Sequence, residues 1–333
     1  MLQQLVDFFK GHSMQHTLQP LLFAVALAAT SFSAYSQPYA YVPNEKDGTV
    51  SVIDTATDAV VNRLPAKGRL GKKIQAAAIH PSNQKLYVVV RDKNAVAVID
   101  TQQGKQVALI KVGDEPEGID ISPDGKWLAA CLEEENAVAL VDLQTNKVKY
   151  TVNTQGRNPE HCVFSPDQQW LLASNEESND VDVIDLNTRK SAHLIAATKH
   201  PRGIGFSPDG KWAYVANEAA SVLEIVSTAD WKVQANIKVG LRSNGVKVNA
   251  DGSRIYVSNG GDHNISVIDT VSRQVIATVA VGQRPWNMAL TPDGKKLYVA
   301  NGRSNSVSVI DTQTNTTLKD IAVGSLPWGV VIR

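Results

Sequence analysis

The sequence predicts an all-β fold, a seven-bladed β-propeller, and three observations carry this prediction. The phrase VIDT or a close variant recurs along the chain, with successive spacings of 46, 42, 43, 42, 42 and 42 residues. A fixed period of this length, with short strands, is typical of four-stranded propeller blades. The chain also ends in a segment that resembles the strand missing from its first repeat. The acidic residue of this phrase is Asp54, Asp100, Asp142, Asp185, Asp269 and Asp311, and Ser227 takes its place in one repeat.

One repeat, residues 283–324, shows how each unit supplies four strands. The segment NMAL is followed by the turn TPDGKK, and the chain returns as LYVAN. The loop GRSN leads into SVSVIDT, and after the turn QTNT the segment LKDIAV completes the unit. Proline presets φ in turns and glycine permits positive φ, whereas β-branched and aromatic residues favour strands. We therefore expect no helix in the repeat.

The two ends of the repeat region complement each other. The first repeat begins at YAYVPN, which aligns with LYVAN, so it lacks an innermost strand. The last residues, LPWGVVIR, align with RPWNMALT, an innermost strand with nothing after it. We expect the C-terminal strand to complete the N-terminal blade, because full closure removes unpaired strand edges.

Composition and the N-terminal segment indicate an exported globular protein. The chain has 333 residues, a formal net charge of zero and 43% hydrophobic residues. It is large enough to bury a core, and its balanced charge argues against general nucleic-acid binding. The apolar run LLFAVALAA, residues 21–29, is too short to span a bilayer and is typical of a secretory signal. We expect a cleaved signal peptide over residues 1–36 and a periplasmic propeller over residues 37–333; a buried first helix is the alternative.

Common catalytic and redox motifs are missing from the sequence. It contains no GxSxG, HExxH or phosphate-binding glycine loop, and no CxxCH motif for haem attachment. Cys131 and Cys162 fall in different predicted blades at core positions, so we expect small buried thiols and no disulfide. These absences argue against nucleophilic catalysis by cysteine or serine.

The segments LYVANGRSNSVSVIDT and IYVSNGGDHNISVIDT resemble the YVTN-repeat β-propeller family, and the resemblance covers roughly residues 39–333. Among its members, the chain is most similar to the β-propeller proteins associated with catabolism that depends on pyrroloquinoline quinone (PQQ). This resemblance implies a periplasmic accessory protein in alcohol oxidation. Its partner would be a quinoprotein dehydrogenase, a cytochrome or a solute-binding protein. The chain departs from the pattern at Ser227, and at Val90 and Leu132 where other repeats have asparagine.

The loops that enter the innermost strands differ most between repeats. The turns on the opposite face keep their residue types, which fits a structural duty. Aligned on the proline that usually precedes the innermost strand, the next residue is in turn Gln75, Glu117, Glu160, Arg202, Asn244, Trp286 and Trp328. Seven equivalent positions around one channel mouth thus carry acids, amides, a base and indoles.

This variation predicts a binding site at the channel mouth, although a solvated mouth that tolerates any polar residue is the alternative. Guanidinium groups beside indole rings suit a planar anionic ligand, because arginine binds carboxylates bidentately and stacks on rings. The planar tricarboxylate PQQ fits that description. The predicted ligand- or partner-binding residues are Glu117, Glu160, His161, His200, Arg202, Arg242, Asn244, Arg284, Trp286 and Trp328.

Charged loops on the same face suggest docking of a protein partner. The segments EEEN and NEESND, with Glu218, are acidic, whereas PAKGRLGKK and Arg303 are basic. Such a dipolar face would steer a charged partner through its long-range potential. Ordinary solvated loops are the alternative interpretation.

A divalent metal is a second hypothesis for the mouth. Glu117, Glu160, His161 and His200 would converge there, and carboxylates with imidazoles suit divalent ions, although no short ligand motif supports this. A propeller hydrolase or lactonase that polarises a carbonyl with a bound cation would need this site. The two histidines are also candidates for haem ligation.

Overall fold

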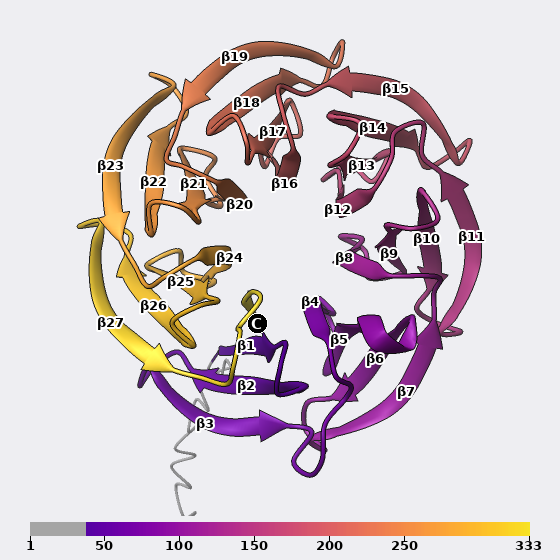
Figure 1. Ribbon diagram of the computed structural model, residues 1–333, viewed down its shortest axis with the longest axis vertical. Helices are drawn as coiled ribbons and strands as arrows, with labels where there is room; N and C mark the ends of the chain where they lie inside the picture. The colour runs from indigo at the N-terminus through magenta and orange to yellow at the C-terminus, as the bar shows by residue number, and fades with distance from the viewer. Residues whose placement is uncertain (1–37) are drawn as a thin grey trace, which may run out of the picture. The chain divides into compact units, whose positions relative to one another are not determined.

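A computed structural model of the protein describes residues 38–333, and the expected signal peptide lies outside these residues. Seven four-stranded antiparallel sheets follow one another around a ring (Figure 1). The predicted all-β, seven-bladed propeller is confirmed. No helix in the described part of the chain is long and apolar enough to cross a membrane. One single-turn 3₁₀ helix, η1 (Arg91–Lys93), departs from the helix-free expectation.

Each blade contributes one strand to the channel wall and one to the rim. The innermost strands are β28 (Val331–Ile332), β4 (Ile74–Ile79), β8 (Pro116–Ile121), β12 (Pro159–Phe164), β16 (Pro201–Phe206), β20 (Ser243–Val248) and β24 (Pro285–Leu290). The outermost strands are β3 (Ala59–Leu64), β7 (Lys105–Lys111), β11 (Lys147–Asn153), β15 (Lys190–Ala196), β19 (Lys232–Lys238), β23 (Gln274–Ala280) and β27 (Thr316–Ala322).

The two middle strands of each blade carry most of the core. The second strands are β1 (Tyr39–Asn44), β5 (Lys85–Val90), β9 (Trp127–Leu132), β13 (Trp170–Asn175), β17 (Trp212–Asn217), β21 (Arg254–Asn259) and β25 (Lys296–Asn301). The third strands are β2 (Thr49–Asp54), β6 (Ala95–Asp100), β10 (Ala137–Asp142), β14 (Asp180–Asp185), β18 (Val222–Ser227), β22 (Asn264–Asp269) and β26 (Ser306–Asp311).

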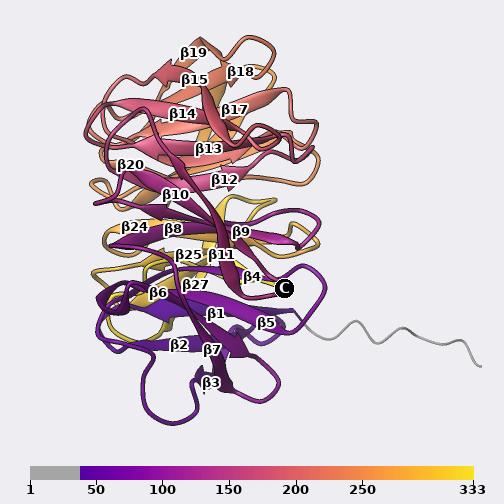
Figure 2. The same cartoon turned by 90° about the vertical axis from the view of Figure 1, so that its right-hand side faces the viewer.

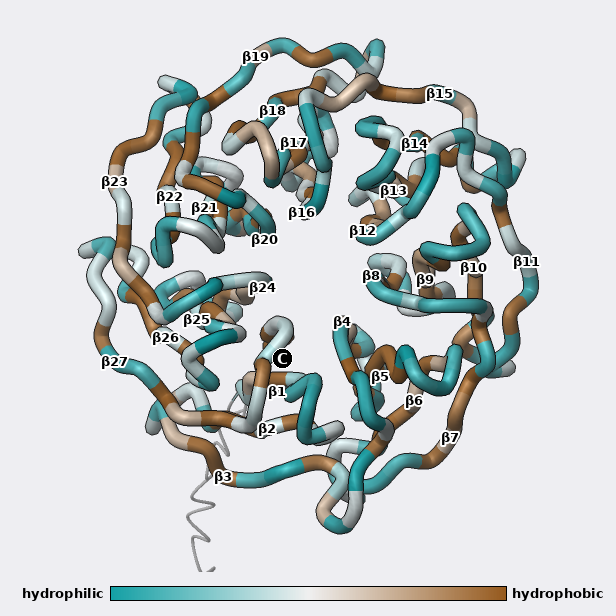
Figure 3. The backbone as a smooth tube through the Cα atoms, in the orientation of Figure 1, coloured by the Kyte–Doolittle hydropathy of each residue, from teal (hydrophilic) through white to brown (hydrophobic). Residues whose placement is uncertain are grey.

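The strands twist strongly from the channel to the rim, as sheets of L-residues do. The outer strands follow the circumference in Figure 1, whereas the inner strands run across the thickness of the ring in Figure 2. Neighbouring blades cover both faces of the middle strands. The sequences of these strands are therefore nearly continuous apolar runs. Figure 3 shows the resulting hydrophobic stretches between hydrophilic loops. Cys131 and Cys162 are free, buried thiols in one such cluster.

The C-terminal segment closes the ring, as the sequence predicts. β28 pairs with β1 through Tyr41 and Val331, and a bridge joins Asn44 to Pro327. The Tyr39 amide donates a hydrogen bond to the Arg333 carbonyl at 2.8 Å. Blade 1 is therefore β28-β1-β2-β3, and blades 2 to 7 follow in chain order from β4.

The repeated turn residues form hydrogen bonds that explain their recurrence. Asp311 Oδ1 accepts the amides of Gln313 at 2.9 Å and Thr314 at 2.8 Å, which fixes the turn before the outermost strand. On the same face, Ser165 Oγ accepts the amide of Trp170 at 3.0 Å, and equivalent bonds occur in other blades. The near-constant SPDG and VIDT phrases therefore have a structural role.

The buried asparagine at the end of the second strand explains the departures at Val90 and Leu132. In four blades its Nδ2 donates to a polar side chain on the third strand, as from Asn301 to Ser308 Oγ at 2.8 Å. Val90 and Leu132 face the equivalents Ala97 and Ala139. The asparagine thus occurs with a hydroxyl or carboxylate partner, and an alkyl side chain occurs with alanine, because an unpaired buried amide is costly.

Replacing Leu132 by asparagine should therefore destabilise the protein. The variant L132N loses a buried alkyl group and gains an amide without a partner at Ala139, which should cost about 3 kcal/mol or more. Adding Ala139→Ser should recover about 1 kcal/mol. Urea unfolding of the two single variants and the double variant measures this coupling. An additive double variant would contradict the pairing argument.

Removing the closing strand should leave an aggregation-prone edge. Deletion of residues 326–333 exposes the hydrogen-bonding groups of β1, so we expect oligomers or aggregates in size-exclusion chromatography with light scattering. A control chain that keeps these residues and carries a flexible eight-residue extension should elute as the wild type does. Unchanged elution of the deletion variant would show that closure is dispensable.

Candidate functional site

The channel mouth is a pocket of about 340 Å³ built from equivalent positions of all seven blades. Six of these residues are second in an innermost strand, and the seventh, Trp328, precedes β28. They are Gln75, Glu117, Glu160, Arg202, Asn244, Trp286 and Trp328. The second-to-third-strand loops and neighbouring positions add Glu45, Arg91, Glu133, His161, Arg284 and Asn287. These thirteen residues are called the channel mouth below.

Irregularities in the backbone of the innermost strands determine where these side chains point. The pairing register shifts at the mouth end of the innermost strand in blades 2 to 7, as between Pro116 and Ile119. Such bulges redirect side chains. Neighbouring inner strands also approach closely, because a Cβ on Gly118 would lie 2.2 Å from the Glu160 carbonyl oxygen. This close approach brings the carboxyl groups of Glu117 and Glu160 together.

Arg91 binds the acidic residues of blade 3. Its Nη1 donates to Glu117 at 2.7 Å and to Glu133 at 3.0 Å, and Nη2 donates to Glu133 at 2.5 Å and to Glu115. Arg91 belongs to η1 in blade 2, so this contact crosses a blade boundary. The carboxylates of Glu117 and Glu133 are both buried, and Arg91 partly compensates their charge.

Arg202 forms the second centre of the network. Its guanidinium group contacts Glu160, Glu176 at 3.0 Å and Glu218 at 3.0 Å. Arg284 contacts the other oxygen of Glu218 at 3.0 Å. Groups from blades 4, 5 and 7 are therefore joined by ion pairs at the mouth, and Arg284 reaches past blade 6 to do so.

Carboxylates outnumber cations in this network. Six carboxylates contact three guanidinium groups, namely Glu115, Glu117, Glu133, Glu160, Glu176 and Glu218 with Arg91, Arg202 and Arg284. Burial and the nearby Glu133 raise the pKa of Glu117 well above its usual range. Burial and the charge of Glu117 raise the pKa of Glu160 to about 11. The mouth is therefore short of positive charge.

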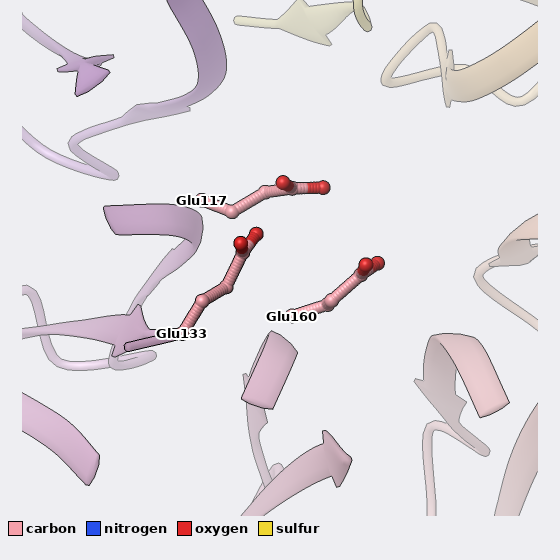
Figure 4. Close-up of side chains that lie close together, drawn as sticks. All are labelled: Glu117, Glu133 and Glu160. Carbon is pink, nitrogen blue, oxygen red and sulfur yellow. The ribbon is translucent and has the colours of Figure 1, made fainter. Parts of the chain in front are cut away.

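Three of these carboxyl groups form a compact cluster. One ligand oxygen each from Glu117, Glu133 and Glu160 lies within 4.8 Å of the others. Figure 4 shows the three side chains extending in a similar direction, so that their carboxyl ends lie on the same side of the group. All three residues are buried. Carboxylate oxygens at this spacing suit Ca²⁺ or Mg²⁺.

Several buried polar atoms of the same pocket have no partner within the described residues, among them the acceptor Gln75 Oε1 and donors on Arg284 and Asn287. Gln75 lines the mouth and is only 9% exposed, yet its Oε1 accepts no hydrogen bond within the described residues. A buried amide oxygen without a partner costs free energy, so it is expected to contact a ligand or a cation. This oxygen comes from blade 2, next to the blade that carries Glu117.

The two predicted histidines have different surroundings. His161 lines the mouth and stacks on Trp328, with ring centroids 5.7 Å apart. Burial and the charge of Arg202 lower the pKa of His161 to about 3, so this imidazole is neutral. His200 lies outside the pocket lining, and its Nδ1 lies 2.9 Å from Glu176 Oε1. Neither histidine belongs to the carboxylate cluster.

The structure brings together eight of the ten residues that the sequence singles out. Glu117, Glu160, His161, Arg202, Asn244, Arg284, Trp286 and Trp328 line the mouth, whereas His200 and Arg242 do not. Arg242 is exposed. Like Arg284 it has a positive φ, so its equivalent position alone does not decide where its side chain points.

Arg91 and Glu133 are absent from the predicted binding residues, as is Gln75, although the repeat alignment places Gln75 at the channel mouth. Glu133 occurs in the EEEN loop that the sequence marks as acidic, but its partner Arg91 gives no signal of its own. Arg91 follows Val90, one of the two positions that depart from the asparagine pattern. The sequence signal for Arg91 and Glu133 is the variation between blades in the loop after each second strand.

The fold and mouth define a seven-bladed propeller with a buried network of ionisable groups at one channel opening. The chain belongs to the family described as lactonase, 7-bladed β-propeller, which matches residues 30–152 and 188–322. No curated protein matches the chain.

The solved structures that are similar to this chain include the following two. A chain of hydrazine synthase from Kuenenia stuttgartiensis is 26% identical, with a TM-score of 0.74, and the match covers 82% of this chain and 92% of that one. A functionally unknown protein from Desulfotomaculum acetoxidans DSM 771 is 18% identical, with a TM-score of 0.78, and the match covers 88% and 98% respectively. The second likeness concerns the fold alone.

Removing Arg202 should destabilise the protein in a pH-dependent way. Although burial raises it, the pKa of Glu176 is lowered to about 2, because Glu160, Arg202 and His200 favour its charged form. This depressed pKa adds stability above the unfolded value of about 4.3, and that stability is lost as pH falls towards 2. Arg202→Met should cost about 3–5 kcal/mol at pH 7 and less at pH 3 in urea unfolding.

The exposed Arg242 supplies the matched control for this variant. Arg242→Met removes a guanidinium group from the same face but not from the network, so its stability should stay within about 0.5 kcal/mol of the wild type. Equal losses in the two variants, or a loss in Arg202→Met that does not change with pH, would contradict the network's role.

Proposed function

We propose that the protein is an accessory binding protein whose channel mouth holds a divalent cation on Glu117, Glu133 and Glu160. The observation that carries this proposal is the buried three-carboxylate cluster in a network with twice as many carboxylates as guanidinium groups. A divalent ion would compensate the excess negative charge, and the unpartnered Gln75 oxygen is a further ligand within the same pocket. Trp286 and Trp328 provide apolar walls for an organic ligand.

PQQ, the ligand suggested by the family resemblance, fits the mouth poorly on its own. All three arginines of the mouth already bind carboxylates, and Arg242 lies outside the pocket. A tricarboxylate would add negative charge to a pocket that has too much. The role in PQQ-linked alcohol oxidation and a dehydrogenase, cytochrome or solute-binding partner are proposals that rest on the resemblance. The periplasmic location is a proposal that rests on the expected signal peptide.

Membership of the lactonase family favours hydrolysis as a second candidate function. A cation on the carboxylate cluster would polarise the carbonyl of a cyclic ester. Water would then add to that carbon and the ring C–O bond would break, which gives a hydroxy acid. The neutral His161 lies in the same pocket, where it would accept a proton from the attacking water.

Cation binding tests the first proposal. The purified protein should retain one equivalent of Ca²⁺, Mg²⁺, Mn²⁺ or Zn²⁺ after dialysis, as measured by elemental analysis and calorimetric titration. Glu133→Gln should weaken this binding at least about tenfold, because it removes one of three charged ligands. Glu134→Gln makes the same change at the adjacent exposed residue and should bind as the wild type does.

Two results would overturn the cation site. One is the absence of stoichiometric binding for all four ions. The other is PQQ binding to the cation-free protein that Arg284→Met abolishes, because this would show that the mouth is an anion site.

Hydrolysis is tested with the same variants. If the second candidate is right, the cation-loaded protein should open δ-valerolactone, followed by acid release at constant pH, and a chelator should stop the reaction. Glu133→Gln should reduce the rate in parallel with cation occupancy. Cation binding without any lactone opening would leave the accessory role as the proposal.

A further inference from the structure

A second cavity of about 390 Å³ lies inside the channel, away from the mouth. Its walls are the innermost strands, and its lining extends to Pro81 and Pro123 in the turns of the opposite face. His161, Asn287 and Trp328 line both cavities, so these three side chains separate the cavity from the mouth. It is a distinct site and plays no part in the proposed cation binding.

Apart from Ser122, His161 and Asn287, the lining is small or apolar except at one level of the channel. This level lies three residues beyond the mouth positions, about 10 Å further along the inner strands. Its seven equivalent residues are Ala78, Asp120, Val163, Gly205, Lys247, Ala289 and Val331. Two opposite charges thus occur in a ring of otherwise small or apolar residues, and both line the cavity.

The two charges face each other across the channel. Asp120 belongs to β8 and Lys247 to β20, which lie on opposite sides of the centre in Figure 1. No ion pair within 4.0 Å joins Lys247 to any carboxylate in residues 38–333. Asp120 Oδ2 is fixed by the amide of Phe164, which donates to it at 2.9 Å. The two charged groups are therefore not paired with each other, and both border the cavity.

The surroundings disfavour leaving these charges uncompensated. Burial raises the pKa of Asp120 to about 6. Desolvation by the surrounding strands lowers the pKa of Lys247, and the charge of Asp120 partly offsets this effect. The Lys247 side chain is nevertheless accessible within the channel. A ligand that carries both opposite charges would compensate both groups at once.

We propose that this cavity binds a small zwitterion with an apolar body, such as a free aliphatic amino acid. Its ammonium group would contact Asp120 and its carboxylate Lys247. Its side chain would lie against apolar wall residues such as Ile119, Ile204 and Met288. The cavity volume lies within the range of small-molecule sites. A ligand with only one charge would leave Asp120 or Lys247 without a partner.

Calorimetric titration with L-leucine tests this proposal. The matched probes 4-methylpentanoate and isopentylamine lack the ammonium and the carboxylate group respectively. We expect leucine to bind and each single-charge probe to bind at least about tenfold more weakly, the effect of one lost charged contact. Asp120→Asn and Lys247→Met should each weaken leucine binding by a similar factor.

Exposed residues supply the controls. Asp230→Asn and Lys238→Met make the same chemical changes on the surface and should leave leucine binding unchanged. Circular dichroism verifies that each variant is folded. If the single variants lose leucine binding, the double variant D120K/K247D, which exchanges the two charges, should restore it. The proposal is overturned by an absence of leucine binding, by equal binding of 4-methylpentanoate, or by unchanged binding in both single variants.

Glu133→Gln keeps this test separate from that of the mouth. This change should impair cation binding and leave leucine binding unchanged, because Glu133 does not line the inner cavity. Loss of leucine binding in Glu133→Gln would contradict the independence of the two sites.

Discussion

The pairing of β28 with β1 is the constraint on which the rest of the molecule depends. Seven blades form a ring only if the last one meets the first, and a few backbone hydrogen bonds around Tyr39, Tyr41 and Val331 make that junction. Each blade is covered by its neighbours, so an open ring would expose the apolar faces of two blades at once. The channel, and both cavities within it, exist because this junction closes.

The mouth departs from the regularity of the ring because its side chains take no part in the turn hydrogen bonds that recur in the blades. Turn residues such as Ser165 and Asp311 hold hydrogen bonds that every blade needs, and their types recur. The second residue of each inner strand supports no such bond. Charges have instead been gathered there across blade boundaries, and the resulting network holds more carboxylates than cations.

The sequence period was sufficient to predict the strand order, the closing strand and most of the mouth. Alignment of repeats works because equivalent positions in a closed ring face a common axis. It could not predict the direction of long side chains, and Arg242 and Arg284 illustrate this. Both have a positive φ of similar size, but only Arg284 reaches a carboxylate, that of Glu218 two blades away. Nor could it reveal Arg91, whose importance arises from Glu117 and Glu133 in the adjacent blade.

The position of Trp328 has a thermodynamic consequence. This residue follows Pro327, which bridges to Asn44 at the junction of the ring, and its ring lines the pocket at the channel entrance. A molecule held against Trp328 would be released whenever the terminal segment detached. Binding of this molecule and detachment of the terminal segment are then linked equilibria. A molecule that binds tightly would therefore stabilise the closed ring and protect the C-terminus from proteases.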